Sequence, residues 1–159
     1  MKLVMASEEF CITCKLCELY CVAEHSRSRD LWKAFKRESP RPLPLITVEQ
    51  DGPLSFGFNC RHCAEPECVF ACPSGAMRKH PDGTVRVDES QCIGCWTCVL
   101  ACPYGAIGRD ERGRHHAVKC DLCPGREVPA CVANCPNRAL ITVERETGVQ
   151  GRTAEEMAS

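Results

Sequence analysis

The chain has 159 residues with a formal net charge of −1, and 16 of its residues are cysteines. The near-neutral charge gives no reason to expect a nucleic-acid partner. With only 6% aromatic residues, the chain has a thin core that needs disulfides or metals to hold it together.

No stretch of the sequence approaches the roughly 20 apolar residues that a membrane-spanning helix requires. Segment 1–10 has neither the features of a signal peptide nor a twin-Arg pair. We therefore expect a cytoplasmic protein. Thiols stay reduced in that compartment, so clustered cysteines there bind metal, which disfavours the alternative of eight disulfides.

In chain order, the first expected element is a helix that runs from the first cysteine group towards His25, because Val22 stands where the other groups have a proline. Segment 26–37 has the pattern of a basic amphipathic helix, and 40–44 that of an extended proline-rich connector. The 26–37 helix either covers the metal sites or is a docking patch for an acidic partner. The apolar side chains concerned are Leu31, Trp32 and Phe35.

The next expected elements are strands. A hairpin pairs 45–48 with 55–58 across Asp51-Gly52. Segments 84–88 and 140–144 alternate apolar and polar residues with the period of a strand.

The connecting segments are polar. We expect a turn at 81–83, ahead of the 84–88 strand. Segment 109–116 is a charged turn, formed by Arg109, Arg112, Arg114, His115 and His116. The polar tail 145–159 is expected to be mobile.

The cysteines fall into four groups of four. Groups one and three have the C-x₂-C-x₂-C-x₃-C run of bacterial ferredoxins, in which three cysteines bind one cluster and the fourth reaches another. The x₃ gap is one helical turn, about 5.4 Å of rise. Group two has four residues between its second and third cysteines, and group four has seven. The groups are Cys11, Cys14, Cys17 and Cys21; Cys60, Cys63, Cys68 and Cys72; Cys92, Cys95, Cys98 and Cys102; and Cys120, Cys123, Cys131 and Cys135.

The alternative metal is zinc. Zinc sites usually pair two C-x₂-C knuckles across a longer spacer. Here each group has a third cysteine close by and a fourth at x₃, which zinc does not require. The spacing therefore favours iron–sulfur clusters.

The groups also form an internal repeat, because a similar segment follows three of them. Segments 73–77, 103–107 and 136–140 each begin with proline and place Ala and an apolar residue four to five residues past a cysteine.

Other chemistry-bearing residues do not suggest an active site. His62 lies between two ligands and we expect it at the surface or behind the ligands. Lys15 and Arg61 lie inside binding loops, where their charge either tunes a cluster or is simply solvated. The sequence has no Gly-rich phosphate loop in a strand–helix context and no acid–base pair apart from the cysteines. We expect no catalytic activity.

Segments 60–68 and 71–76 resemble the second motif of the four-cluster subunits of dimethyl sulfoxide reductase, formate dehydrogenase and formate hydrogenlyase. The resemblance covers about Cys11 to Val143. Segments 33–44 and 92–98 resemble the iron–sulfur protein of CO dehydrogenase and also the small subunit of tungsten aldehyde oxidoreductases, which these motifs do not separate.

The resemblance implies an α+β fold of two ferredoxin-like halves, one inserted into the other, with small sheets and short helices. Segments 1–40 and 110–144 form the split half, and 41–109 the inserted half.

The resemblance also implies four [4Fe–4S] clusters with nested ligands. The sets are Cys11, Cys14, Cys17 and Cys135; Cys21, Cys120, Cys123 and Cys131; Cys60, Cys63, Cys68 and Cys102; and Cys72, Cys92, Cys95 and Cys98.

The function implied is that of a non-catalytic subunit. It relays low-potential electrons between a catalytic oxidoreductase, of CO dehydrogenase or tungsten aldehyde oxidoreductase type, and a flavin or nicotinamide subunit. The alternatives are a subunit of a formate dehydrogenase or hydrogenase complex, a zinc-stabilised interaction module, and a catalytic iron–sulfur enzyme. Clusters near both ends would also allow chains to stack into longer assemblies.

Overall fold

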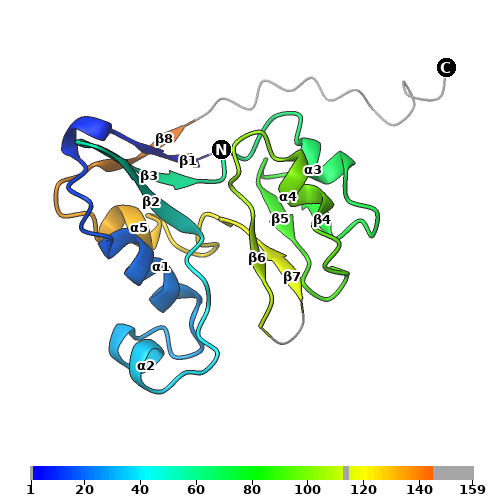
Figure 1. Cartoon of the computed structure of the whole chain (residues 1–159), viewed down its shortest axis with the longest axis horizontal. Helices are drawn as coiled ribbons and strands as arrows, with labels where there is room; N and C mark the ends of the chain where they lie inside the picture. The colour runs from blue at the N-terminus through cyan, green and yellow to red at the C-terminus, as the bar shows by residue number, and fades with distance from the viewer. Residues whose placement is uncertain (1, 113–114, 145–159) are drawn as a thin grey trace.

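The computed structural model describes residues 2–112 and 115–144. The predicted mobile tail 145–159 and Arg114 of the charged turn lie outside the described residues. Short helices and small antiparallel sheets make up the fold, as expected for an α+β protein (Figure 1). In chain order the elements are β1 (Lys2–Ala6), η1 (Glu8–Phe10), α1 (Leu16–His25), α2 (Leu31–Lys36), β2 (Ile46–Asp51), β3 (Leu54–Asn59), α3 (Glu67–Phe70), β4 (Met77–Lys79), β5 (Val85–Val87), α4 (Thr97–Ala101), β6 (Gly108–Asp110), β7 (His116–Val118), α5 (Ala130–Ala133) and β8 (Leu140–Glu144).

Every sheet among the described residues has two antiparallel strands. β1 pairs with β8, with Leu3 opposite Val143, so the first and last strands lie side by side. β2 and β3 form the predicted hairpin across Gly52, which has the left-handed φ that the tight turn needs. β4 pairs with β5, and β6 with β7. The predicted strands at 84–88 and 140–144 are confirmed as β5 and β8.

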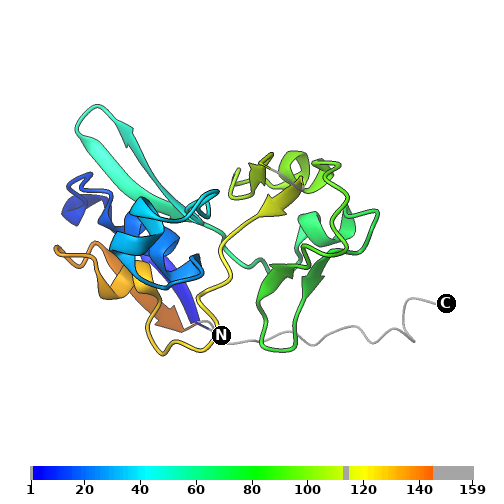
Figure 2. The ribbon, with the colours of Figure 1, turned by 90° about the horizontal axis from the view of Figure 1, so that it is seen from below.

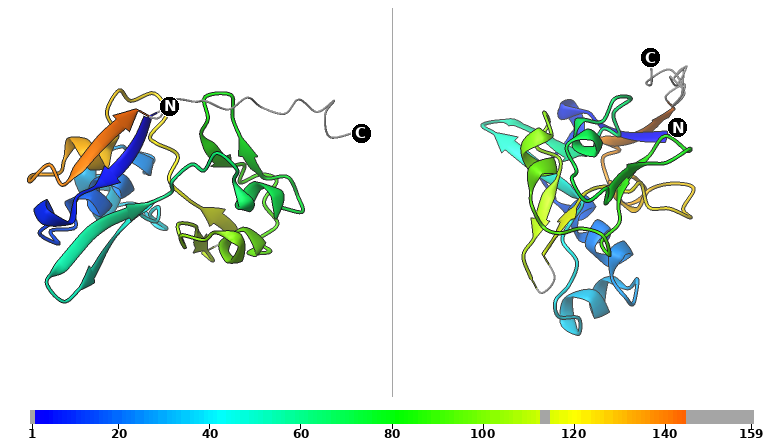
Figure 3. Two further views of the ribbon diagram at one scale, coloured as in Figure 1. Left: turned by 90° about the horizontal axis from the view of Figure 1, so that it is seen from above. Right: turned by 90° about the vertical axis from the view of Figure 1, so that its right-hand side faces the viewer.

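The elements gather in two groups (Figures 1 and 2). The first group holds β1, β8, α1, α2, α5 and the β2–β3 hairpin, and the second holds β4 to β7 with α3 and α4. Viewed from above, the chain crosses from the first group to the second after β3 and returns after β7 (Figure 3, left). Each group has its own buried core, because Val4 and Leu140 belong to one cluster and Met77 and Val85 to another.

The β2–β3 hairpin belongs to the segment 41–109 that the resemblance assigns to the inserted half, yet it packs in the first group. Alternate residues of β2, Ile46 and Val48, are buried. They share the core of Val4 and Leu140. Burial of one face of the hairpin therefore fixes its place beside β1 and β8 rather than beside β4 and β5.

The four cysteine groups share one local backbone shape. In each group the residue before the second cysteine has a positive φ; these residues are Thr13 (58°), His62 (43°), Gly94 (68°) and Leu122 (63°). The third cysteine then falls in the first turn of a short helix; these are Cys17 in α1, Cys68 in α3, Cys98 in α4 and Cys131 in α5. The fourth cysteine follows one helical turn later, as the x₃ gap predicts.

The sequence repeat after the cysteine groups corresponds to a repeated turn. Gly75, Gly105 and Arg138 all have positive φ. Each donates its backbone N–H to the carbonyl of the cysteine three residues earlier, at 3.2–3.3 Å. The apolar residues that follow are buried; they are Met77, Ile107 and Leu140.

The predicted helix at 26–37 is shorter than expected. Ser26 ends α1, because its hydroxyl and its backbone N–H both donate to the carbonyl of Ala23. Asp30 then caps α2 by accepting from the backbone N–H of Lys33 at 2.8 Å. Trp32 is 68% exposed and does not cover the cysteines. The α1 helix reaches His25 as predicted.

Among residues 2–112 and 115–144, none of the helices has the length and apolar character needed to span a membrane.

Candidate metal centres

All sixteen cysteines lie within the described residues, and all are free thiols. Twelve of them line three pockets, four cysteines to each, and each of these pockets combines cysteines from two groups of the sequence.

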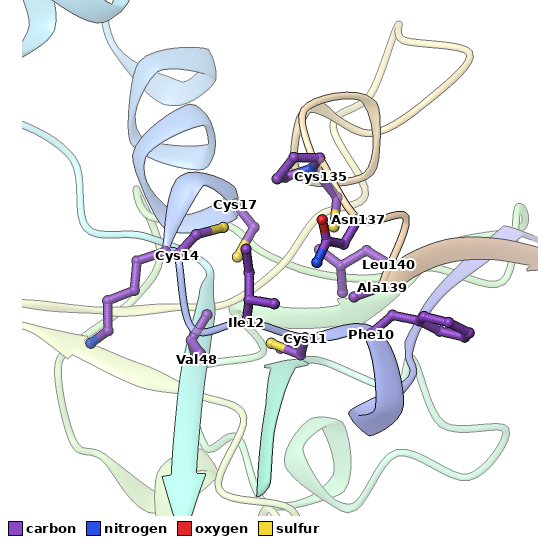
Figure 4. Close-up of a pocket in the computed structure, with 13 residues that line it drawn as sticks. Phe10, Cys11, Ile12, Cys14, Cys17, Val48, Cys135, Asn137, Ala139 and Leu140 are labelled. Atoms are coloured by element: carbon purple, nitrogen blue, oxygen red, sulfur yellow. The ribbon is translucent and has the colours of Figure 1, made fainter. Parts of the chain in front are cut away.

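The first set joins the two ends of the chain. Cys11, Cys14 and Cys17 approach from the loop before α1 and from its first turn, and Cys135 approaches from the segment after α5 (Figure 4). They line a mostly apolar pocket of about 370 Å³. Cys14 is exposed, so this set reaches the surface.

Two further sets lie in the second group of elements. They line pockets of about 350 and 320 Å³, which are close in size to the first. The larger pocket is lined by Cys60, Cys63, Cys68 and Cys102, and the smaller by Cys72, Cys92, Cys95 and Cys98.

The remaining four cysteines, Cys21, Cys120, Cys123 and Cys131, are all buried. The pKa of Cys131 lies far above that of an ordinary thiol. Burial is the main cause, and the charges of the other three cysteines add to it. Burial also raises the pKa of Cys120 to about 12. The charges of Cys120, Cys21 and Cys123 all act on Cys131, which indicates that the other three lie near it.

The raised pKa values have a chemical consequence. Burial raises the pKa of Cys17 and of Cys68 to about 11. Without a metal these thiols keep their protons at neutral pH. Metal binding must therefore release protons and supply the positive charge that makes buried thiolates stable.

Hydrogen-bond donors from the chain surround the sulfur atoms. Such donors stabilise thiolate charge and tune the potential of a bound cluster. They are the backbone N–H of Leu45 to Cys21 (3.2 Å), of His62 to Cys60 (3.4 Å), of Met77 to Cys72 (3.5 Å) and of Ala117 to Cys92 (3.5 Å), the Thr97 hydroxyl to Cys95 (3.4 Å), and the Asn59 amide to Cys120 (3.7 Å).

A histidine–carboxylate pair lies against the buried set. The His25 Nδ1 atom is 2.8 Å from the Cys21 carbonyl oxygen, and its Nε2 atom is 3.0 Å from Oδ1 of Asp121. Burial lowers the pKa of His25, but the hydrogen bonds with Asp121 and Cys21 outweigh it and raise the pKa to about 11. His25, Asp121 and the thiol of Cys123 lie close enough together to share a metal ion.

His62 is fully buried, which excludes the surface alternative and is consistent with the expected position behind the ligands. Its Nδ1 atom accepts the backbone N–H of Val85 at 3.0 Å. Burial, followed by the charge of Lys119, lowers the pKa of His62 to about 3 and keeps the ring neutral. Its Nε2 atom has no partner among the described residues.

Lys15 lines the pocket of Cys11, Cys14, Cys17 and Cys135, and Arg61 lines the pocket of Cys60, Cys63, Cys68 and Cys102. The Nη1 atom of Arg61 contacts the Met5 sulfur at 2.9 Å. Lys15 precedes α1 with a left-handed φ of 57°. Asn59, Asp121 and Lys119 were not predicted. Asp121 and Lys119 stand next to Cys120 in the sequence, and that adjacency was the available signal for them.

The donor set fits iron–sulfur clusters. Four thiolates per site are the ligands that [4Fe–4S] clusters require. The Nε2 atom of His62, which lies between two of these cysteines in the sequence, is buried without an acceptor among the described residues. A buried N–H without an acceptor costs about 1–3 kcal/mol.

The chain matches a family described as 4Fe-4S dicluster domain over residues 54–145. It is similar to "Electron transport protein HydN" of Escherichia coli (strain K12), with 38% identity over 91% of this chain and 89% of that protein. It is also similar to the B subunit of anaerobic dimethyl sulfoxide reductase from the same organism, with 51% identity over 82% of this chain and 67% of that protein.

A solved structure shares the fold. It is titled "Active site complex BamBC of Benzoyl Coenzyme A reductase in complex with Zinc", and the match has a TM-score of 0.52 and 23% identity. The match covers 99% of this chain and 86% of that one.

Proposed function

The chain belongs to the 4Fe-4S dicluster domain family, and from this membership we propose that it is a non-catalytic electron-transfer subunit with four [4Fe–4S] clusters. The observation that supports the proposal is that twelve cysteines line three pockets, four to each, and that the remaining four are buried with three of them acting on the fourth.

We assign one cluster to each set and number the sites along the molecule. Site I is Cys11, Cys14, Cys17 and Cys135; site II is Cys21, Cys120, Cys123 and Cys131; site III is Cys60, Cys63, Cys68 and Cys102; and site IV is Cys72, Cys92, Cys95 and Cys98. When bound, each cluster supplies a one-electron carrier. The chain holds it, sets its potential through nearby donors and charges, and limits its contact with water.

The order of the sites follows from the elements that they share. Sites I and II share α1, which carries Cys17 and Cys21 one turn apart. Sites III and IV are joined through α3, because Cys68 of site III lies in that helix and Cys72 of site IV follows two residues after its end. Sites II and III meet at Asn59, whose amide contacts the sulfur of Cys120 and the carbonyl of Cys60. Together these contacts support a row from I to IV.

We further propose that the two groups of elements are ferredoxin-like halves, one inserted into the other. The pairing of β1 with β8 and the contact of α1 with α5 support a split half built from both ends of the chain. The β2–β3 hairpin then belongs to the split half, and the inserted half begins near Cys60.

Electrons would enter and leave at the two ends of the row. Sites I and IV each have one exposed cysteine, Cys14 and Cys95. Beside them lie Ile12, 61% exposed, and Ile93, 66% exposed. An apolar rim around an exposed ligand suits docking of another redox protein.

For partners we propose a catalytic oxidoreductase subunit of CO dehydrogenase or tungsten aldehyde oxidoreductase type and a flavoprotein that uses NAD(P). The resemblance of segments 33–44 and 92–98 supports this choice. A formate dehydrogenase or hydrogenase complex is the alternative. We place the protein in the cytoplasm, where sixteen thiols stay reduced until iron arrives. Purification of the native complex followed by tungsten and nickel analysis distinguishes the partners.

The test of the central proposal is metal analysis of anaerobically purified protein with EPR of the reduced state. We expect about sixteen iron and sixteen sulfide per chain, four of each for every cluster, and a brown colour. Colourless protein with stoichiometric zinc would replace the proposal with a zinc-stabilised interaction module.

A further inference from the structure

Lys119 is a lysine buried where the chain returns from the second group of elements to the first. It is 4% exposed. Its Nζ atom donates to the carbonyl of Val85 on β5 and, at 3.0 Å, to the carbonyl of Cys120. One side chain therefore ties the core of the second group to a ligand of site II.

The charge of Lys119 also reaches site III. Burial raises the pKa of Cys68, and the charge of Lys119 opposes that rise. The pKa of His62, which lies between two ligands of site III in the sequence, is lowered mainly by burial and next by the charge of Lys119. The ammonium group thus contacts the backbone of a site II ligand, Cys120, and acts electrostatically on a site III ligand, Cys68.

No carboxylate of the described residues lies within ion-pair distance of Lys119. A buried charge without a counter-charge costs several kcal/mol. Carbonyl oxygens solvate an ammonium group but do not cancel its charge, so the counter-charge must come from groups bound on either side. Iron–sulfur clusters with thiolate ligands are such anions.

This inference rests on the proposed four-cluster function. We propose that Lys119 is a positioning residue for electron transfer, a buried cation shared by sites II and III that raises the reduction potential of both. A positive charge stabilises the added electron in a low-dielectric interior. The reduction potentials of sites II and III then shift in the same direction and stay close to each other. This favours passage of the electron between the two groups of elements.

The test is an EPR-monitored redox titration of the whole protein and of three variants. Lys119→Gln keeps an N–H donor and removes the charge, Lys119→Met removes both, and Lys119→Arg keeps the charge. Lys33→Gln, an exposed lysine on α2, is the matched control. Iron content is measured for every sample.

We expect Lys119→Gln and Lys119→Met to shift two of the four potentials to more negative values. The shift should be at least tenfold in the reduction equilibrium, about 59 mV for one electron. Lys119→Arg and Lys33→Gln should leave all four potentials in place. If Lys119→Gln and Lys119→Met lose iron instead, loss from only two of the four sites, with full iron content in Lys119→Arg, supports the same conclusion.

Four unchanged potentials in a fully loaded Lys119→Gln protein would overturn the inference and leave the four-cluster proposal intact. An arginine variant that behaves like the glutamine variant, or loss of iron from all four sites, would also overturn it. Wild-type protein without iron would overturn both proposals.

Discussion

The Nε2 atom of His25 lies 3.0 Å from Oδ1 of Asp121, so the last residue of α1 contacts a residue 96 positions later in the sequence. Asp121 also accepts the backbone N–H of Cys123 at 2.9 Å. The pair therefore connects the helix that carries Cys21 to the loop that carries the other ligands of site II.

We predict that His25→Phe and Asp121→Ala each speed the loss of iron from site II. Each variant leaves a part-buried polar partner unsatisfied, which costs about 1–3 kcal/mol. The measurement is the rate of anaerobic iron transfer to a chelator, followed by the EPR signals that disappear. Because the two residues are coupled, the double variant should lose iron more slowly than the product of the single effects.

Glu24 and Arg126 provide the control for this prediction. Their side chains also join α1 to the fourth cysteine group, at 2.8 Å, but Arg126 is exposed. Exposed pairs contribute about 0–1 kcal/mol, so Glu24→Gln should change the rate little. Equal effects of Glu24→Gln and His25→Phe would show that the His25–Asp121 pair has no special role at site II.

The assignment of ligands predicts that two cysteines of one group serve different clusters. Cys131 and Cys135 are four residues apart, yet we place them at sites II and I. Cys135→Ser should remove the same EPR signal as Cys11→Ser, and Cys131→Ser the same signal as Cys21→Ser. Each variant should lose up to about four iron atoms per chain. Matching losses for Cys131→Ser and Cys135→Ser would refute nested ligation.

The cysteine spacing predicted much of the candidate site but not its surroundings. The x₃ gap has a local cause, one helical turn, and therefore could be read from the sequence. The alternation in 140–144 predicted β8. It did not predict the partner strand β1, because pairing across the whole chain depends on tertiary packing. The burial of Lys119 was not predicted for the same reason, because it depends on contact with Val85, 34 positions earlier in the chain.

The left-handed residue in each C-x₂-C loop leads to a prediction about strain. Gly94 and Thr13 hold equivalent positions, with φ of 68° and 58°. A β-branched residue in this conformation is strained by about 1–2 kcal/mol. Thr13→Gly should therefore stabilise the protein, by about 0.5–1 kcal/mol after the entropy cost of glycine. The measurement is the midpoint of anaerobic thermal bleaching at one fixed scan rate, since unfolding with loss of iron is irreversible.

The reverse change should destabilise the equivalent loop. A Cβ atom at Gly94 would lie 3.0 Å from both the Cβ atom and the carbonyl oxygen of His115. Gly105 has a similar φ of 63° with nothing within 4 Å, so Gly105→Ala is the control for strain alone. We expect Gly94→Ala to lower the midpoint clearly more than Gly105→Ala. An equal drop would show that the backbone near His115 moves away freely.

The last prediction concerns iron removal. Of the seven buried residues in the core of the first group, Cys17, Cys21 and Cys131 are cysteines. A site of four thiols that loses its metal leaves unfilled space in this core. Because binding energy at such a site is also folding energy, chelation under reducing conditions should unfold the chain. Circular dichroism should show loss of the helix signal in parallel with the iron released, and iron with sulfide should restore it. An iron-free chain that keeps its ellipticity and protects its amides from hydrogen exchange would show that the apolar residues, such as Val4 and Leu140, hold the fold without the clusters.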